Sequence, residues 1–191
     1  KRGRKSFIKS AYEIIWIRKT SKAKVPLKDS FLTVKTIKIA QRVKPLIRNV
    51  PNFPINGIIF RDTSLLLQNP KIFSEVIDYT VNIYKNLDID YIVAKDMQGV
   101  LWAGALAKQL GIGIIPMFRK DVVPPILITS YSHEYNPERV LNLQKNTIKK
   151  GDRLLIIDYM IATGATVLNM GKLIEHLGGK VVGVFSLMEL E

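Results

Sequence analysis

The stretch Leu154–Thr166 reads LLIIDYMIATGAT and combines an apolar run, a carboxylate and a loop of small and hydroxyl-bearing residues. The apolar run is typical of a buried strand that ends at Asp158, and a helix is predicted to begin near Val167. Small residues let backbone amides approach an anion, the helix N-terminus adds positive potential, and Thr163 and Thr166 supply hydroxyls. The stretch therefore predicts a phosphate site at a strand end, where open α/β sheets bind their ligands.

The same residues would also suit an ordinary connection between a strand and a helix, so the loop alone does not identify a ligand. It is not a Walker loop, because no Gly-Lys-Ser/Thr follows it. Asp158, at the carboxyl end of the strand, can accept hydrogen bonds from sugar hydroxyls. The loop and the carboxylate are therefore candidates for phosphate and sugar binding.

Strand and helix patterns alternate through the rest of the chain, after a stiff turn at residues 50–54. This alternation predicts an open, mainly parallel α/β sheet flanked by helices. A charged, proline-containing loop is predicted to follow Phe118. The predicted strands are Gly57–Phe60, Tyr91–Lys95, Ile112–Phe118, Arg153–Asp158 and Lys180–Leu187, and the predicted helices are Phe31–Val43, Lys71–Asn86, Gly99–Leu110 and Val167–Leu177.

The net charge of +13 is concentrated near the N-terminus. Residues 1–48 hold 15 basic and two acidic residues, whereas the remaining residues hold 14 of each sign. We divide the chain into a basic N-terminal extension, residues 1–41, and a globular body, residues 42–191. Helical spacing of apolar residues predicts an amphipathic helix over Ser6–Arg18, and we expect residues 1–28 to be removable without unfolding the body.

A basic run is often only a solvated surface, but this degree of charge segregation favours a polyanionic partner, with RNA preferred over a membrane surface. The residues predicted to bind RNA are Lys1, Arg2, Arg4, Lys5, Lys19, Lys22, Lys24 and Lys28. The composition of residues 1–28, rich in Lys, Arg and Ser and poor in acids, resembles organellar targeting segments. We therefore predict a mitochondrial protein, with the cytoplasm as the alternative, and because Lys1 is not a methionine we expect residues before it.

Composition excludes several classes of protein. The chain has 191 residues, is 47% hydrophobic and contains no cysteine. A wholly disordered chain, a disulfide-stapled domain, a thiolate zinc site and a cysteine nucleophile are therefore excluded. No apolar stretch is long enough to predict a membrane span. The two histidines are isolated, so we predict no metal-ligand set.

Four segments of the body resemble the adenine phosphoribosyltransferase family of type I phosphoribosyltransferases. Residues 158–166 resemble the family's phosphoribosyl-pyrophosphate motif. VPNFP at residues 50–54 with GIIFRD at residues 57–62 resembles I-P-D-F-P…G-x-x-F-R-D, and SYSHEY at residues 130–135 resembles S-Y-x-L-E-Y. DMQG at residues 96–99 stands where the family has an acidic-small-Arg-Gly turn. The segments keep the family's order from about Arg42 to Glu191, so the resemblance implies a type I phosphoribosyltransferase-like domain over residues 42–191.

The resemblance also implies a reaction, in which ribose phosphate is transferred to adenine N9 while pyrophosphate leaves. Catalysis of this reaction would rest on positioning, loop closure and stabilisation of the leaving group. If the protein is active, it would require Mg²⁺. The family's usual state is a homodimer. The resemblance implies that the loop binds AMP or phosphate through Ala162, Thr163, Gly164, Ala165 and Thr166, and that Asp158 binds the ribose. It implies adenine binding by Phe60 and Arg61, and pyrophosphate binding by Asp96, Met97, Gln98 and Gly99. A loop containing Glu134 would close over the site, and Glu134 and Asp158 would be catalytic residues only if the protein is active.

The chain departs from the family on the leaving-group side. Gln98 replaces an arginine, and Tyr159 replaces a second aspartate; this tyrosine either plugs the ribose site or is a tolerated surface substitution. The loop Arg119–Pro125 is about two residues shorter than the family's R-K-x-G-K-L-P-G and lacks its glycine and second lysine. A neutral amide cannot balance a leaving pyrophosphate as a guanidinium does, and each loss predicts a rate decrease of about 10²-fold.

These features favour a repurposed protein with little or no activity. In this interpretation the basic extension docks it in a large ribonucleoprotein, best fitted by a mitochondrial ribosome, with RNA and neighbouring proteins as partners. The alternative is an active adenine phosphoribosyltransferase that makes AMP and pyrophosphate in purine salvage. A third hypothesis is a regulator that senses a nucleotide through the phosphate loop.

Overall fold

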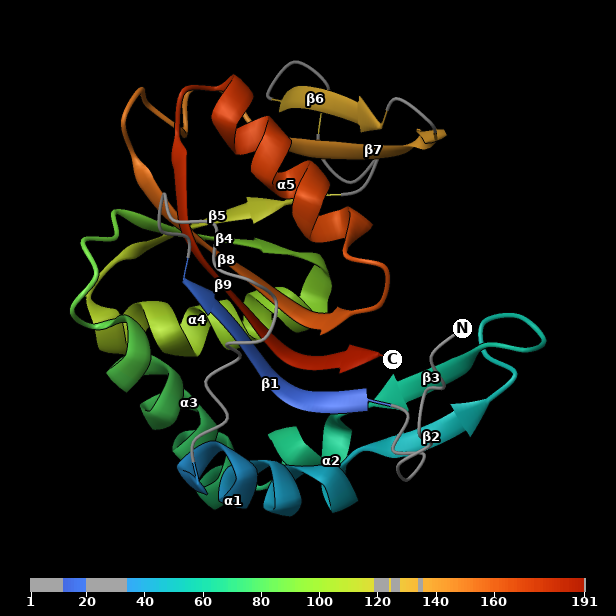
Figure 1. The fold of residues 1–191 in the computed structure, drawn as a ribbon. Coiled ribbons are helices and arrows are strands. Elements are labelled where there is room, and N and C mark those ends of the chain that lie inside the picture. The colour runs from blue at the N-terminus through green and yellow to red at the C-terminus, as the bar shows by residue number, and fades with distance from the viewer. Residues whose placement is uncertain (1–11, 20–33, 119–123, 125–127, 134–135, 191) are drawn as a thin grey trace, which may run out of the picture.

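The computed structural model describes residues 12–19, 34–118, 124, 128–133 and 136–190, and its centre is a five-stranded sheet (Figure 1). The strand order is β1-β9-β8-β4-β5, in which the last four are parallel and β1 is antiparallel to β9. The prediction of an open, mainly parallel sheet is confirmed. Its strands are β1 (Tyr12–Lys19), β4 (Tyr91–Lys95), β5 (Gly113–Met117), β8 (Arg153–Ile161) and β9 (Lys180–Leu190).

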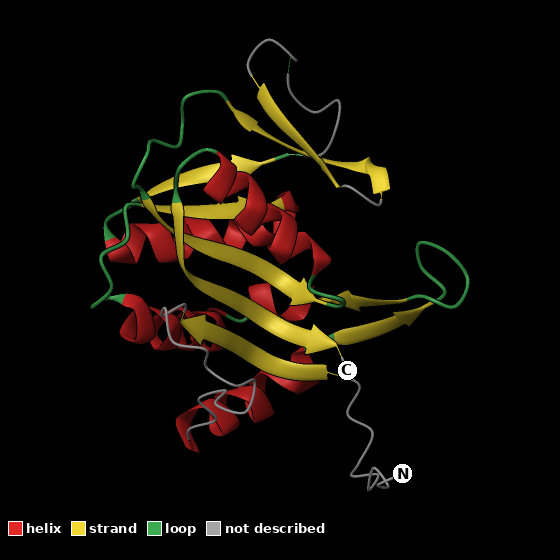
Figure 2. Cartoon of the chain, turned by 45° about the horizontal axis from the view of Figure 1, so that its top comes forward, coloured by secondary structure: helices red, strands yellow, loops and turns green. Residues whose placement is uncertain are grey.

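Helices cover both faces of this sheet (Figure 2): α1, α3 and α4 lie on one side and α5 on the other. They are α1 (Val34–Val43), followed by a 3₁₀ turn (Lys44–Leu46), α2 (Ser64–Leu67), α3 (Pro70–Tyr84), α4 (Asp96–Leu110) and α5 (Ala165–His176). The helices predicted after the turn at residues 50–54 are found within about three residues of their expected bounds. Among the described residues, no helix is long and apolar enough to cross a bilayer.

Strand alternation divides the core between the two faces of the sheet. On β8, Leu155 and Ile157 pack toward α3 and α4, whereas Leu154 and Ile156 pack toward α5. All four are buried, which explains why the strand reads as a continuous apolar run. The Tyr84 hydroxyl at the end of α3 donates a 2.6 Å hydrogen bond to the carbonyl of Val184 in β9, so that helix is fixed directly to the sheet.

Two hairpins lie outside the main sheet: β2 (Arg48–Pro51) with β3 (Ile59–Asp62), and β6 (Ile128–His133) with β7 (Asn136–Gln144). The loop predicted to follow Phe118 falls mostly outside the described residues, but no strand is predicted over β7. Its apolar alternation is short, because Pro137 and two charged residues precede the buried Leu141 and Leu143. The prediction therefore recognised SYSHEY only by resemblance and missed the strand that pairs with it.

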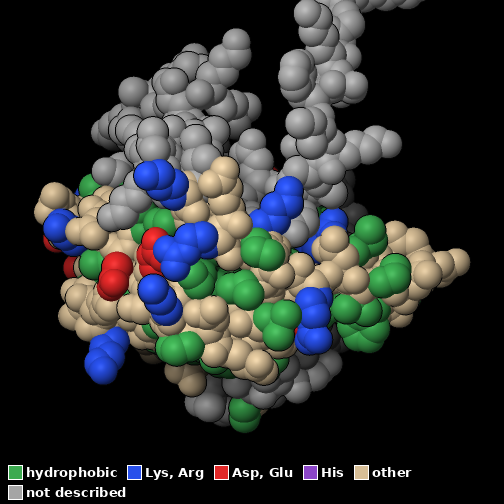
Figure 3. Space-filling model, turned by 90° about the horizontal axis from the view of Figure 1, so that it is seen from below, with side chains coloured by type: hydrophobic (Ala, Val, Ile, Leu, Met, Phe, Trp, Pro, Cys, Tyr) green, Lys and Arg blue, Asp and Glu red, His purple; other side chains and the backbone are tan. Residues whose placement is uncertain are grey.

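The β2–β3 hairpin projects from the body and carries exposed apolar side chains. Figure 3 shows such side chains gathered on the side of the molecule where the hairpin lies. A group of this kind often marks an interaction surface. The exposed apolar residues of the hairpin are Val50, Phe53, Ile55, Ile58 and Ile59.

The amphipathic helix predicted over Ser6–Arg18 is wrong for its described part, and the helical N-terminal extension is corrected accordingly. Residues 12–19 form strand β1, which pairs with β9 from Tyr12 opposite Leu190 to Lys19 opposite Gly183. Aromatic and β-branched residues favour strands, and the free edge of β9 offers unpaired amides and carbonyls. The spacing of apolar residues in this segment cannot distinguish a helix from a strand, because so many of its residues are apolar that both patterns fit.

The structure also joins part of the predicted extension to the body. The expected boundary between residues 41 and 42 falls inside α1, and Ile39 and Val43 of that helix are buried in the main core. Of the predicted RNA-binding residues, Lys19 ends β1. The others lie outside the described residues, namely Lys1, Arg2, Arg4, Lys5, Lys22, Lys24 and Lys28.

Candidate functional site

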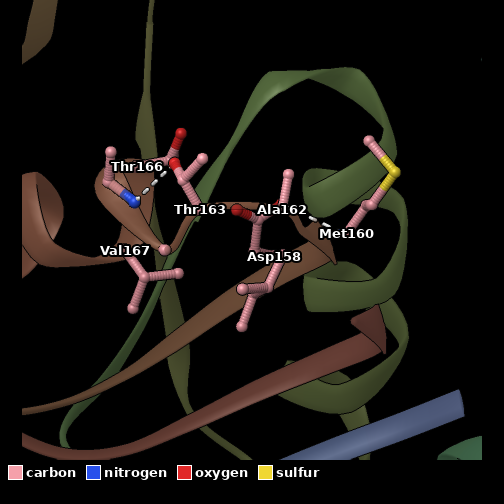
Figure 4. A pocket seen from close by; sticks show the side chains of 9 residues that line it. Asp158, Met160, Ala162, Thr163, Thr166 and Val167 are labelled. Carbon is pink, nitrogen blue, oxygen red and sulfur yellow. Dashed lines mark hydrogen bonds between the residues drawn. The ribbon is translucent and has the colours of Figure 1, made fainter. Parts of the chain in front are cut away.

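A pocket of about 240 Å³ opens at the carboxyl end of β8 (Figure 4). It is bounded by the end of the strand, the loop that follows and the first turn of α5. Every residue predicted to bind the phosphate lines it, so this loop faces an open pocket rather than packed side chains. The lining residues are Asp158, Met160, Ile161, Ala162, Thr163, Gly164, Ala165, Thr166 and Val167.

The backbone of this loop turns at Gly164, where φ is 77° and ψ is −4°. That left-handed conformation favours glycine, because a side chain would be strained there. Ala165 is not among the described residues with positive φ, so an alanine at this position of the loop is unstrained. The Ala165 amide donates to the Thr163 hydroxyl at 3.4 Å. The twelve-residue helix α5 therefore begins at the pocket and directs its positive N-terminal potential toward it.

Asp158 lies at the base of the pocket and is only 8% exposed. Burial raises the pKa of its carboxyl group to about 6, because a buried charge is poorly solvated. The Met160 amide, which donates to Oδ1 at 3.3 Å, and the positive charge of Lys95 lower this pKa, whereas the negative charge of Asp96 raises it. At neutral pH the carboxylate is ionised and can accept hydrogen bonds from a ligand.

The predicted pyrophosphate turn forms the first turn of α4, which begins where β4 ends. Asp96 has a φ of 60° and forms an ion pair with Lys95, whose Nζ donates a 3.0 Å hydrogen bond to Oδ2 of Asp96. Met97 is 74% exposed, whereas Gly99 is buried and lies so close to the Ile157 carbonyl that a Cβ there would be 3.4 Å from its oxygen. A small residue at position 99 therefore lets α4 pack against β8.

Gln98 is held away from the pocket. Its Oε1 accepts a 3.1 Å hydrogen bond from the hydroxyl of Thr63, the buried residue that follows β3, and Gln98 does not line the pocket. The bond joins the turn at the start of α4 to the segment that carries the predicted adenine-binding residues.

Those residues, Phe60 and Arg61, are consecutive residues of strand β3. Phe60 makes an edge-to-face contact with Phe53, with ring centroids 5.3 Å apart, and the buried Arg61 donates to the side-chain oxygen of Asn49. Neither lines the pocket. The structure thus brings Asp158 together with the phosphate loop and the start of α4, and connects the adenine-binding segment to them through Thr63.

Three further residues were either expected at the site from the sequence or missed by the sequence analysis. Tyr159 packs against the core on the α4 side and does not line the pocket, so the expectation that it plugs the ribose site is wrong. Glu134 lies outside the described residues.

Lys95 was missed in the sequence analysis, although a lysine at the end of the otherwise apolar strand YIVAK is a signal of a functional residue. Within the described ranges, no three His, Asp or Glu residues gather as a metal site.

Asp62, the last residue of β3, stabilises the end of the β2–β3 hairpin, and its substitution tests this contribution to stability. Its carboxylate accepts bonds from the Ser64 hydroxyl and amide and from Arg48, which lower its pKa from 3.8 to about 2. The stabilisation is present above pH 3.8 and is lost as the pH falls toward 2. We expect Asp62→Asn to lower the free energy of unfolding at pH 7 by about 1 to 2 kcal/mol. Urea unfolding should show this difference shrinking toward pH 2; a constant difference would contradict it.

The chain is similar in sequence to known enzymes. Residues 62–189 match the family described as the phosphoribosyl transferase domain. Over 149 residues the chain is 40% identical to the adenine phosphoribosyltransferase of Thermosipho melanesiensis, an alignment that covers 78% of this chain and 85% of that protein. Over 150 residues it is 42% identical to the adenine phosphoribosyltransferase of Brachyspira hyodysenteriae, covering 78% of this chain and 88% of that protein.

The fold is similar to solved structures of the same kind. Adenine phosphoribosyltransferase from Rhodothermus marinus has a TM-score of 0.71 and 32% identity, and the match covers 78% of this chain and 85% of that one. The enzyme from Saccharomyces cerevisiae, solved with adenine and an imino-altritol bisphosphate, has a TM-score of 0.65 and 32% identity. That match covers 76% of this chain and 85% of the yeast chain.

Proposed function

Because the chain belongs to the adenine phosphoribosyltransferase family, we propose that it transfers ribose 5-phosphate from phosphoribosyl pyrophosphate to adenine, forming AMP and pyrophosphate. The observation that carries this proposal is the pocket in which Asp158 and the phosphate loop meet. A carboxylate for sugar hydroxyls beside a helix N-terminus for a phosphate suits a ribose 5-phosphate.

In the proposed reaction, the loop at Thr163–Thr166 binds the 5′-phosphate and Asp158 accepts a hydrogen bond from a ribose hydroxyl. Adenine lies against Phe60, and its N9 forms a bond to ribose C1′ while the bond from C1′ to the pyrophosphate oxygen breaks. The N9 proton leaves to solvent. Charge builds up on the departing pyrophosphate, so cations near it lower the barrier. Mg²⁺ that accompanies the substrate would supply such positive charge.

The rate is expected to be low, because the arginine and the second aspartate of the family are absent. The full chain should convert labelled adenine to AMP, in the presence of phosphoribosyl pyrophosphate and Mg²⁺, about 10⁴-fold below the ordinary kcat range of about 1–10³ s⁻¹, because two losses of about 10²-fold each multiply. Thr163→Val should reduce the rate further, whereas Leu168→Ala, on an exposed position beyond the pocket, should not.

The same assay separates the alternatives. A chain that binds AMP but forms none would favour nucleotide sensing, and a chain that neither binds nor forms AMP would contradict the proposed activity and favour the repurposed protein. A homodimer, the state expected from the family, is also proposed; the exposed apolar residues of the β2–β3 hairpin are a surface that would suit it.

Docking to RNA is a second candidate function, favoured by the charge distribution. Residues 1–48 carry the whole net charge of +13. Such a segment binds phosphates with the release of counterions and a steep dependence on salt. We propose that it binds the RNA of a large complex, with the mitochondrial ribosome as the candidate, through backbone and shape contacts.

A further inference from the structure

We propose that Lys95 binds the pyrophosphate group of the substrate and supplies the positive charge that Gln98 cannot. The inference rests on the proposed function and assigns a role to a residue that the resemblance does not include. It depends on where Lys95 lies, which charges surround it and what Gln98 does instead.

Strand alternation places Lys95 on the pocket side of the sheet. Ala94 of β4 pairs in parallel register with Ile157 of β8, so Lys95 and Asp158 are the next residues along two neighbouring strands. Val93, two residues before Lys95, packs in the cluster on the α5 face. Because alternate residues of a strand share a face, Lys95 emerges on that face too, beside Asp158.

The charges around Lys95 also relate it to the site. Its Nζ atom is 3.0 Å from Oδ2 of Asp96, and its side chain is only 17% exposed. Its positive charge lowers the pKa of the Asp158 carboxyl, while Asp96 acts on the same group in the opposite direction. One ammonium therefore lies within electrostatic reach of two carboxylates at the carboxyl ends of β4 and β8.

Gln98 cannot replace this charge. Its amide is neutral, and its oxygen accepts a hydrogen bond from Thr63, on the segment that follows β3. The residue that stands where the family has its arginine therefore contacts the adenine-binding segment, whereas Lys95 lies on the same face of the sheet as Asp158, next to the residues that line the pocket and not among them. In this chain the positive charge at this end of the sheet is therefore on Lys95, three residues before the position at which the family has its arginine.

The ion pair with Asp96 prepares the ammonium for this role. A lysine binds phosphate as a point charge, and holding it in place before the ligand arrives reduces the entropy lost on binding. The oxygens of a pyrophosphate carry more negative charge than the single carboxylate they compete with. The ligand therefore gains a largely desolvated cation without recruiting a flexible side chain from solvent.

The test measures binding of magnesium pyrophosphate and of AMP to the full chain by calorimetry. Lys95→Met removes the charge at similar length, Lys95→Arg retains it, and Lys108→Met makes the same change at the exposed far end of α4. We expect Lys95→Met to weaken pyrophosphate binding about 10- to 100-fold and AMP binding less than about threefold. Lys95→Arg and Lys108→Met should stay close to the wild type.

Kinetics and folding give independent readouts. Lys95→Met should raise KM for phosphoribosyl pyrophosphate and lower kcat, while KM for adenine stays unchanged; a merely structural role would not produce this split. Thermal unfolding verifies that the variants fold, with Lys95→Gln as a second neutral replacement should methionine disturb the turn.

Each of the following results would overturn the assignment. If the wild type binds pyrophosphate and Lys95→Met and Lys95→Gln bind it equally well, Lys95 does not contact it. If Lys95→Arg is as weak as Lys95→Met, the effect is one of shape and not of charge. A wild type that binds AMP but no pyrophosphate also refutes the role of Lys95 alone, whereas one that binds neither refutes the proposed function with it.

Discussion

Asp158→Asn is expected to make the protein more stable at pH 7.5 and much weaker in binding AMP. The folded-state pKa of this carboxyl is raised from 3.8 to about 6, so the stability contributed by its protonated form is lost as the pH rises through 6. Asparagine is neutral and can still accept from the Met160 amide. The free energy of unfolding should therefore rise by about 2 to 3 kcal/mol at pH 7.5. AMP affinity should fall about 10- to 100-fold, because a charged acceptor is lost.

Urea unfolding at several pH values and calorimetry with AMP measure the two effects. The stability difference between the variant and the wild type should shrink from pH 7.5 to about pH 4, where both carry a neutral side chain. Asp88→Asn is the matched control, because its carboxylate is 87% exposed and lies away from the pocket. A variant that is destabilised at pH 7.5, or that binds AMP as tightly as the wild type, would contradict the place given to Asp158.

Removal of residues 1–33 is expected to destabilise the body, in contrast to the harmless truncation predicted from the sequence. It deletes β1, whose backbone pairs with β9 from Tyr12 to Lys19. Losing this ladder should lower the free energy of unfolding by at least about 2 kcal/mol, since each hydrogen bond contributes about 1 kcal/mol. The uncovered edge of β9 should also promote aggregation. Thermal unfolding and light scattering measure both effects.

A shorter truncation separates stability from RNA binding. Removing residues 1–11 keeps β1 but deletes five basic residues, so thermal stability should match the wild type. RNA binding, measured by filter retention at several salt concentrations, should weaken and show a shallower salt slope. If the 1–11 truncation binds RNA as the full chain does, the N-terminal cluster does not dock the protein. If the 1–33 truncation is as stable as the full chain, β1 contributes nothing to the fold.

The sequence predicted the body of the fold well, because the buried strands have strong local signals. β4 was predicted with its observed bounds, since four consecutive apolar residues that end at a lysine favour a short inner strand. β1 was not, because its partner β9 lies at the other end of the chain and no local pattern reports a distant free edge. β7 was missed for a related reason. Its first half contains a proline and two charged residues and gives no strand pattern, so only its pairing with β6 identifies it as a strand.

The candidate site was predictable where one segment supplies all its parts. The pocket follows a single run from Asp158 to Val167, and all five predicted phosphate-loop residues line it. What the sequence could not give is the direction of side chains from neighbouring strands. That Gln98 accepts a hydrogen bond from Thr63 while Lys95 lies on the same face of the sheet as Asp158 depends on strand register and on the sharp turn at Asp96. Neither is visible in the spacing of residues 95–99.

The pairing of β1 with β9 joins the first and last described strands, and this has a consequence for synthesis on the ribosome. About 170 residues separate the two partners along the chain. At roughly 5 to 20 residues per second, β1 waits on the order of 10 to 30 seconds for its partner strand. The core around β4 and α3 can form during that time, whereas the outer edge of the sheet closes only after β9 has been synthesised. The nascent chain therefore presents its basic N-terminal segment and an unpaired strand together until β9 emerges.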